Sequence, residues 1–400
     1  MGCRVATLGE LSLDNGKYGI AAPAVDFDTE LPAYLRITDI NDDGTLNKLD
    51  RKSVNDPNAC KYMLSEGDIV FARTGNSTGR NYFYDPRDGK FAFAGFLVKF
   101  SLDASKVNPR FVKYYAQSRA YWDWVASFKT GSTRGNINAK TYAQMPIPLP
   151  ERSAQNSIVA LCDCISDKIR VNAQLNGYLA EYLKSCAKRL YREYERDEEA
   201  DLSEGWHWTT IGEISEMVCR GITPKYNDAS DELILGQTCI RNNLVLLENG
   251  RLHAPRKITE KWLKKYDLLI NSTGVGSLGR TAQVWFDPSK LVVDSHVTIV
   301  RAADPRHALY MGFWAFEHER YIESLHTGST GQTELPRDHV KAIRLVLPSD
   351  AELEKFNAVA QPAVELIVAN QKESKRLAEL RDTLLPKLMS GEIDVSNVAI

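Results

Sequence analysis

Thr130-Gly131-Ser132-Thr133, followed by the strand-like residues 145–150 (Met-Pro-Ile-Pro-Leu-Pro), recurs further along the chain. The second occurrence is Thr327-Gly328-Ser329-Thr330, followed by residues 343–348 (Ile-Arg-Leu-Val-Leu-Pro). A repeat period of roughly 200 residues is far longer than that of a solenoid, so each copy is a domain rather than one small structural unit. The chain therefore carries two related domains, an arrangement that suits recognition of a two-part target.

The similarity extends to the N-terminal side of both stretches. Residues 67–80 match residues 266–280, because each segment has an Asp, an apolar strand, a Thr-Gly pair and a closing Gly-Arg pair. Residues 7–10 (Thr-Leu-Gly-Glu) match residues 210–213 (Thr-Ile-Gly-Glu). The duplication therefore covers most of each domain.

Composition sets broad limits on function. A chain of 400 residues can form two or more domains that each bury a core. The formal net charge of −2 is unusual for a DNA-binding protein, but it excludes none, because local basic patches and partner subunits can contact phosphates. The seven cysteines lack metal-type spacing, so we expect reduced thiols and no metal site. No stretch resembles a membrane span or a signal peptide, and we expect a cytoplasmic protein.

Four segments of the chain differ in character. Residues 1–151 and 201–348 carry short β-rich runs separated by Asn, Asp and Gly turns, which is typical of mixed α/β (α+β) domains. Residues 152–200 and 349–400 carry apolar residues at spacings of three and four, which predicts two long helices. The predicted fold is therefore two domains in a pseudo-two-fold arrangement, separated by an antiparallel coiled coil of these helices.

Asn172 and Asn370 occupy equivalent positions in the two helical segments, on or beside the apolar stripe. Buried between the helices, such residues would cost stability but fix the register. The alternative is that both side chains are solvated at the edge of the stripe. The sequence leaves these two possibilities about equal.

Two pairs of polar loops are candidates for ligand contact. The Gly/Ser/Thr-rich segments 74–80 and 271–280 each follow a strand, and their backbone N–H groups and hydroxyls could contact DNA phosphates. Neither has the spacing or the lysine of a nucleotide P-loop. Basic and amide side chains surround the Thr-Gly-Ser-Thr loops, as phosphate anchoring and base reading require. The alternative in each case is an ordinary connecting turn, and recurrence in both copies favours a function.

Catalytic patterns are absent from the sequence. The aromatic stretches 114–128 and 313–321 have helical spacing, which favours core packing over base stacking. The His318-Glu319 pair lacks a second histidine four residues on, and the Gly274–Gly279 glycines lack a dinucleotide-type unit. No nucleophile, base and orienting group come together, so we expect a non-catalytic chain that binds no cofactor.

These features resemble the specificity (S) subunit of type I restriction–modification systems, over essentially the whole chain. The residues that carry the resemblance are the two Thr-Gly-Ser-Thr loops with their strands and the segment 380–393 (Leu-Arg-Asp-Thr-Leu-Leu-Pro-Lys-Leu-Met-Ser-Gly-Glu-Ile). The second loop departs from the pattern, because Glu334 and Pro336 would lie near phosphates.

The resemblance implies two target-recognition domains, each reading one half of an asymmetric, split site in double-stranded DNA. The coiled coil would fix the spacer and dock two modification subunits, which carry S-adenosylmethionine and adenine methyltransferase activity. Restriction subunits would add ATP- and Mg-dependent translocation and endonuclease activity. Two alternatives remain: a coiled-coil scaffold whose domains bind protein, and the recognition subunit of a modification-only methyltransferase.

The residues that we predict to contact DNA lie in the four loops. They are Arg73, Thr74, Asn76, Ser77, Thr78, Arg80, Lys129, Thr130, Ser132, Thr133, Arg134, Asn136, Asn138, Asn271, Ser272, Thr273, Arg280, Thr327, Ser329, Thr330 and Gln332. We expect these residues to anchor the DNA backbone, with sequence selection left to parts of the domains that do not repeat.

Overall fold

The computed structural model describes residues 4–47, 50–128, 136–196, 201–254, 260–328 and 333–393. The chain divides into two compact units, one made of residues 1–169 and 374–400 and the other of residues 170–373. Each unit therefore contains one of the two repeated domains and a portion of both long helical segments.

The first domain is built on two four-stranded sheets. One has the order β2 (Lys17–Tyr18), β9 (Leu97–Ser101), β6 (Asp68–Ala72) and β7 (Asn81–Phe83), with antiparallel neighbours throughout. The other has the order β3 (Ala24–Asp26), β5 (Lys52–Val54), β4 (Ala33–Leu35) and β8 (Phe91–Phe93), with a parallel β4–β8 pair. β1 (Arg4–Thr7) pairs with β10 (Pro146–Leu149), which joins the start of the domain to its end.

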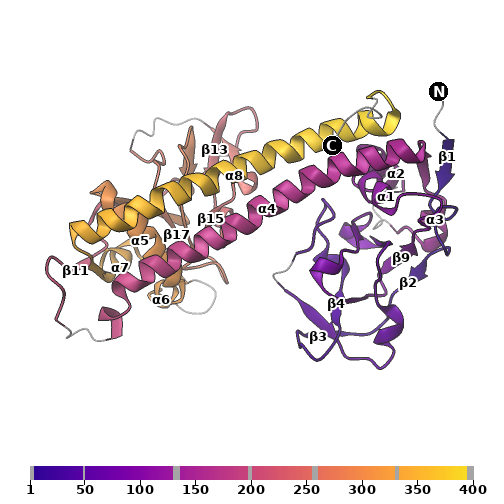
Figure 1. The fold of residues 1–400 in the computed structure, drawn as a ribbon. Coiled ribbons are helices and arrows are strands. Elements are labelled where there is room, and N and C mark those ends of the chain that lie inside the picture. Colours follow the sequence, from indigo (N-terminus) through magenta and orange to yellow (C-terminus); the bar gives the residue numbers. More distant parts are fainter. Residues whose placement is uncertain are drawn as a thin grey trace. The chain divides into compact units, whose positions relative to one another are not determined.

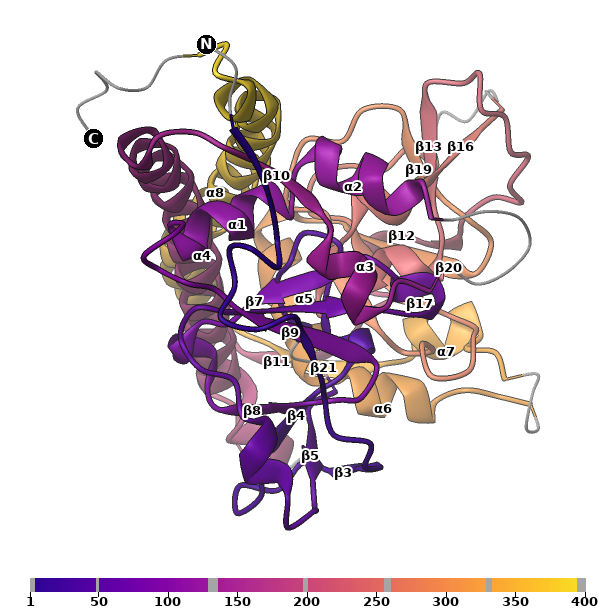
Figure 2. The ribbon, with the colours of Figure 1, turned by 90° about the vertical axis from the view of Figure 1, so that its right-hand side faces the viewer.

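Side-chain alternation along β6 separates the two cores of this domain. Ile69 and Phe71 pack into the cluster formed with α1 (Pro109–Tyr115), α2 (Arg119–Ala126) and α3 (Ala139–Ala143). Val70 and Ala72 point to the opposite face and pack against the second sheet. Figure 2 shows these layers, with the three helices on one side of β7 and β9 and the strands β3, β4, β5 and β8 on the other.

Aromatic residues of the helical stretch fill the first core, as the sequence predicts. Tyr114 and Tyr121 are fully buried, and the Tyr121 hydroxyl donates to the Gly79 carbonyl oxygen at 2.5 Å. Tyr142 stacks on Phe71 with ring centroids 4.8 Å apart and donates to the Ala72 carbonyl oxygen. These hydroxyls tie α2 and α3 to the loop that follows β6.

The second domain repeats the main sheet of the first and three strands of its second sheet. Its main sheet has the order β12 (Ser215–Arg220), β20 (Val297–Ala302), β17 (Leu268–Asn271) and β18 (Thr281–Gln283). A second sheet has the order β16 (Arg251–His253), β13 (Glu232–Leu235) and β19 (Leu291–Val293), with a parallel β13–β19 pair. β14 (Ile240–Arg241) and β15 (Leu244–Val245) form a hairpin, and β11 (His207–Thr210) pairs with β21 (Arg344–Leu347).

Helices α5 (Pro305–Glu317), α6 (Glu319–Ser324) and α7 (Arg337–Lys341) take the places of α1, α2 and α3. Short 3-10 helices occur in both domains. They span Ile37–Asp39, Ala59–Tyr62, Gly75–Ser77, Pro86–Asp88, Tyr194–Arg196, Gln237–Cys239 and Leu247–Asn249.

The repeated sequence signatures make the same local contacts in both domains, which confirms the duplication. The Thr7 amide donates to Glu10 at 2.7 Å, and the Thr210 amide donates to Glu213 at 2.9 Å. These backbone hydrogen bonds are the largest cause that lowers the pKa of both glutamates below the usual value.

Two long helices run through both units: α4 (Arg152–Tyr191) and α8 (Asp350–Ser390). Within the first unit, Ile158 of α4 and Leu388 of α8 enter the domain core. Within the second unit, Leu183 of α4 and Val364 of α8 do the same. Figure 1 shows α4 and α8 side by side, and residue 172 contacts residue 373 whereas residue 176 contacts residue 367, so the pair is antiparallel.

Both seam asparagines are buried, so the solvated alternative is wrong. Asn172 is 2% exposed and Asn370 is 7% exposed. Asn172 donates to Glu373 at 2.7 Å, and Asn370 donates to the Asn176 side-chain oxygen at 2.9 Å. Because each amide finds a partner on the other helix, the polar contacts are satisfied only in this register.

Candidate nucleic-acid interface

The loop after β6 in the first domain is a tight turn built around two glycines. Gly75 has φ +73° and Gly79 has φ +96°, and a Cβ on Gly79 would lie 2.6 Å from Val125 Cγ1. Thr78 is buried, and its hydroxyl donates to the Gly75 carbonyl oxygen at 2.8 Å. Asn76 lies exposed at the tip of this turn, where a ligand could reach it.

Arg73, at the start of the same loop, lies between two aromatic rings. Its guanidinium carbon is 5.1 Å from the centre of the Tyr18 ring and 5.8 Å from that of Phe96. Tyr18 is 44% exposed and Phe96 is 55% exposed, so the arrangement is open to solvent on one side. Among the described residues no carboxylate pairs with Arg73, which leaves its charge available to a ligand.

The remaining described residues of the first interface have several different roles. Thr74 forms a backbone bridge with Asn136, which is exposed. Asn138 caps α3 by accepting from the Thr141 amide at 2.9 Å. Arg80 pairs with Asp42 at 2.7 Å, so it must release a carboxylate before it can contact a phosphate.

The equivalent loop of the second domain is longer by one residue, and several of its predicted contact residues face inward. Asn271 donates to the Gln237 carbonyl oxygen at 3.1 Å, and Ser272 shares a 2.6 Å hydrogen bond with Thr298. Both side chains are fully buried, so we correct their predicted role, and that of Thr78, from contacting DNA to supporting the loop. Arg280 donates to the Gly276 carbonyl oxygen at 2.6 Å and closes the turn on itself.

The exposed polar groups of the second domain lie beside this loop. Thr273 Oγ1 is 2.9 Å from His296 Nδ1 and also accepts from Gln237. Thr327 and Glu334 exchange two backbone hydrogen bonds, of 2.8 Å and 3.0 Å. A backbone bridge between Thr273 and Glu334 links these two sets of contacts, so the segments around residues 273 and 327 lie next to each other.

Glu334 is neutralised by a residue that the sequence did not single out. Arg220 Nη2 lies 2.8 Å from Glu334 Oε1 and 2.7 Å from the Leu335 carbonyl oxygen, and Nη1 lies 3.3 Å from the Ser295 carbonyl oxygen. Burial lowers the pKa of Arg220 below its usual value, and the charge of Glu334 opposes that shift. The carboxylate that looked unfavourable near a phosphate is therefore held in an ion pair.

Eight predicted contact residues lie outside the described part of the chain. They are Lys129, Thr130, Ser132, Thr133, Arg134, Ser329, Thr330 and Gln332. Sequence reasoning missed Tyr18, Phe96, Arg220, Gln237 and His296 because each lies in a different segment from the loop it contacts. Only strand pairing brings these segments together, so no local motif could have revealed them.

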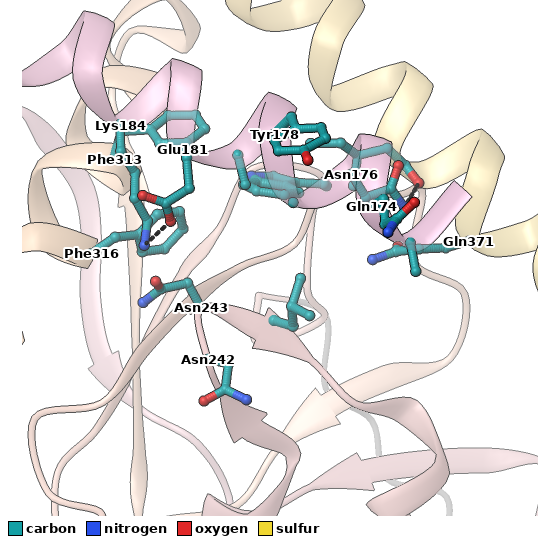
Figure 3. A pocket seen from close by; sticks show the side chains of 16 residues that line it. Gln174, Asn176, Tyr178, Glu181, Lys184, Asn242, Asn243, Phe313, Phe316 and Gln371 are labelled. Carbon is teal, nitrogen blue, oxygen red and sulfur yellow. Dashed lines mark hydrogen bonds and ion pairs between the residues drawn. The ribbon is translucent and has the colours of Figure 1, made fainter. Parts of the chain in front are cut away.

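A pocket of about 670 Å³ lies in the second unit between α4 and the domain. Figure 3 shows Gln174, Asn176 and Gln371 at one end, and Phe313 and Phe316 near Lys184 at the other. Glu181 and Lys184 are 3.5 Å apart and are the only charged residues that line it among the described residues. The rest of the lining combines amide side chains with aromatic rings.

Comparison with known proteins finds similarity to one family. Residues 9–180 match the model for the type I restriction modification DNA specificity domain.

Type I restriction enzyme specificity subunits are similar to much of the chain. The type I restriction enzyme MjaIX specificity subunit of Methanocaldococcus jannaschii is 22% identical, over 73% of this chain and 71% of the relative. The HindI specificity subunit of Haemophilus influenzae is 19% identical, over 90% of this chain and 95% of the relative. The crystal structure of a type I restriction–modification S subunit from M. genitalium has the same fold, with a TM-score of 0.58 and 15% identity over 97% and 96% of the two chains.

The residues that the structure describes contain neither a membrane-spanning helix nor a cluster of metal ligands. No helix there is long and apolar enough to cross a membrane. No three His, Cys, Asp or Glu side chains in the same residues gather closely enough to hold a metal ion.

Proposed function

We propose that this chain is the DNA-specificity subunit of a cytoplasmic type I restriction–modification complex. Each domain reads one half of an asymmetric, bipartite target in double-stranded DNA. The observation that carries the proposal is the duplication: two domains of the same fold place a Gly-rich loop and a cluster of exposed polar side chains at the same position. The family match supports a DNA target over the protein-binding scaffold.

Different side chains on the shared framework support two different half-sites. The first domain offers a guanidinium between two aromatic rings, and the second offers a histidine, a threonine and an arginine–glutamate pair. Phosphate contacts from loop hydroxyls and backbone N–H groups set the register, and base contacts select the sequence. Two domains with identical surfaces would instead read a symmetric site.

The paired helices supply a spacer of fixed register in this proposal. The cross-helix asparagine contacts penalise sliding of α4 against α8, because a shifted register leaves buried amides without partners. The length of the helices then sets the number of base pairs between the half-sites. Each domain would keep its own half-sequence when that length changes.

An exposed apolar stripe on α4 supports docking of a modification subunit. Val171, Leu175, Tyr178 and Tyr182 recur at spacings of three and four, and Tyr178 is 75% exposed beside the pocket of Figure 3. Such a stripe has the pattern of a helix that packs against a partner. The modification subunits would bring S-adenosylmethionine chemistry, and restriction subunits would bring ATP- and Mg-dependent cleavage, while this chain performs no catalysis.

Co-expression with a modification subunit from the same genome tests the proposal. Single-molecule methylome sequencing of these cells should reveal adenine methylation at one split motif, and cells expressing the modification subunit alone should lack it. Methylation without a motif, or none although the two proteins co-purify, would favour the protein-binding scaffold. Adding the restriction subunit and ATP then separates a full restriction complex from a modification-only enzyme.

A further inference from the structure

Four positions surround the repeated loop in each domain, and we call each set the loop corner. The first loop corner consists of Tyr18, Arg73, Phe96 and Asn136, and the second consists of Arg220, Ser272, His296 and Glu334. No residue type is shared between the two corners at any equivalent position.

Backbone hydrogen bonds establish that these positions are equivalent. The Arg73 amide donates to the Phe96 carbonyl oxygen at 3.0 Å, and the Ser272 amide donates to the His296 carbonyl oxygen at 2.9 Å. The Arg73 and Ser272 carbonyl oxygens accept from Ile137 and Leu335, which directly follow the fourth position of each corner. The main chain is therefore conserved between the domains while the side chains on it change.

The first position of each corner is held by the same steric constraint. Tyr18 and Arg220 each precede a glycine whose Cβ would clash with carbonyl oxygens, at 2.2 Å for Gly19 and 2.1 Å for Gly221. Only glycine fits where two backbones approach this closely. The residue before the glycine is therefore fixed at the same position of the fold in both domains.

Apart from Ser272, which is fully buried, the corner side chains combine exposure with fixed placement. Tyr18 and Phe96 flank the guanidinium of Arg73, whose Nε is buried without a hydrogen-bond partner. The Glu334 side chain is 62% exposed, yet Arg220 holds one of its carboxylate oxygens. Base recognition requires polar groups that are open to solvent but held in place by their neighbours. A mobile side chain discriminates less well between bases, because it must be ordered on binding.

We infer that the loop corners are the specificity-determining positions, with Arg73 reading a guanine in the first half-site and Glu334 reading a cytosine in the second. Arginine donates two hydrogen bonds to guanine O6 and N7, and a glutamate accepts from the cytosine N4 amino group. Arg220 cancels the charge of Glu334, so the carboxylate reaches a base edge without repelling the phosphates. This inference rests on the proposed function and adds which side chains choose the bases.

Substitutions at these two residues test the inference in the complex of the full chain with its modification subunits. Glu334→Gln replaces an acceptor by an amide, which matches adenine instead of cytosine. We expect one cytosine of the second half-site to become adenine in the methylated motif, with a change of about 10-fold in preference. Arg73→Gln should relax one guanine of the first half-site by a similar factor and leave the second half unchanged.

Matched controls use exposed residues of the same charge in the same domains. Asp338→Asn and Arg119→Gln lie outside the loop corners, and both should leave the motif unchanged. Glu334→Asp keeps the charge but shortens the side chain, and should weaken the cytosine preference without introducing another base. Its result does not depend on correct folding of the glutamine variant.

The outcomes separate this inference from the proposed function. If the unaltered complex methylates no bipartite motif, the proposed function fails. If it methylates one, but the half-sites lack the guanine or the cytosine or are unaltered by all three substitutions, only the assignment of the loop corners is overturned. A change in the half-site opposite to the substituted domain would overturn it as well.

Discussion

Arg220 and Glu334 form an ion pair of 2.8 Å in the second domain. It joins the end of β12 to the segment that follows the Thr-Gly-Ser-Thr loop of this domain. The same guanidinium also donates to the Leu335 and Ser295 carbonyl oxygens, so one side chain ties three segments together. An acidic residue is compatible with the proposed DNA-binding surface because its charge is balanced within the protein.

Removal of Arg220 should weaken DNA binding through the carboxylate that it leaves unpaired. We expect Arg220→Ala to lower the affinity of the assembled complex for its target by about 10-fold, since an unpaired carboxylate repels phosphates. The double variant Arg220→Ala/Glu334→Ala should bind more tightly than Arg220→Ala alone, as fluorescence anisotropy with a labelled duplex would measure. Additive losses from the two substitutions would contradict coupling between the residues.

The cross-helix asparagines should contribute measurable stability. Asn370→Ala removes the donor to the Asn176 side chain, and we expect the free energy of unfolding to fall by about 1–2 kcal/mol. Lys372→Ala, an exposed neighbour on α8, is the control and should change it by less than about 0.5 kcal/mol. Urea denaturation followed by circular dichroism measures both, and equal effects would remove Asn370 from the register contacts.

Arg80 should contact phosphate only after it leaves Asp42. Asp42→Asn removes the competing carboxylate, so we expect tighter binding and a steeper dependence of log K on log salt concentration. Arg80→Ala should have the opposite effect, with the salt slope reduced by about one. Binding isotherms of the complex across a salt series test this, and unchanged slopes in both variants would remove Arg80 from the phosphate contacts.

The duplication and the helices could be predicted from the sequence because their signals are local and periodic. Gly-rich turns, a strand after an Asp and apolar residues at spacings of three and four need no tertiary information. The burial of Asn172 and Asn370 could not be decided in advance, since a residue at the edge of a stripe becomes buried only when the partner helix is placed.

The candidate site was harder to predict for a different reason. Tyr18, Arg73 and Phe96 are distant in sequence, and they meet because β2 and β6 both pair with β9. Asn271 and Ser272 are buried because they meet Gln237 and Thr298, which are distant from them in sequence. Loop composition thus indicated the position of the proposed interface but not which of its side chains are exposed.

The stripe on α4 should carry part of the affinity for a modification subunit. Tyr178→Ala truncates its most exposed aromatic residue, and we expect association to weaken by about 10-fold while the fold is retained. Tyr321→Ala, an exposed tyrosine of α6 away from the stripe, should have no effect. Analytical ultracentrifugation of the mixed subunits would decide, and equal effects of the two variants would exclude the stripe as the docking surface.

The central claim is that two independent readers are joined by helices that set the spacer. A matched insertion tests it most directly, with four residues added to α4 after Gly177 and four to α8 after Ile367. The Asn172–Glu373 and Asn370–Asn176 contacts then keep their partners. Each helix lengthens by about 6 Å, which corresponds to one or two base pairs. Methylome sequencing should then show both half-sites unchanged and separated by a longer spacer, whereas an altered half-site with the original spacer would contradict the account.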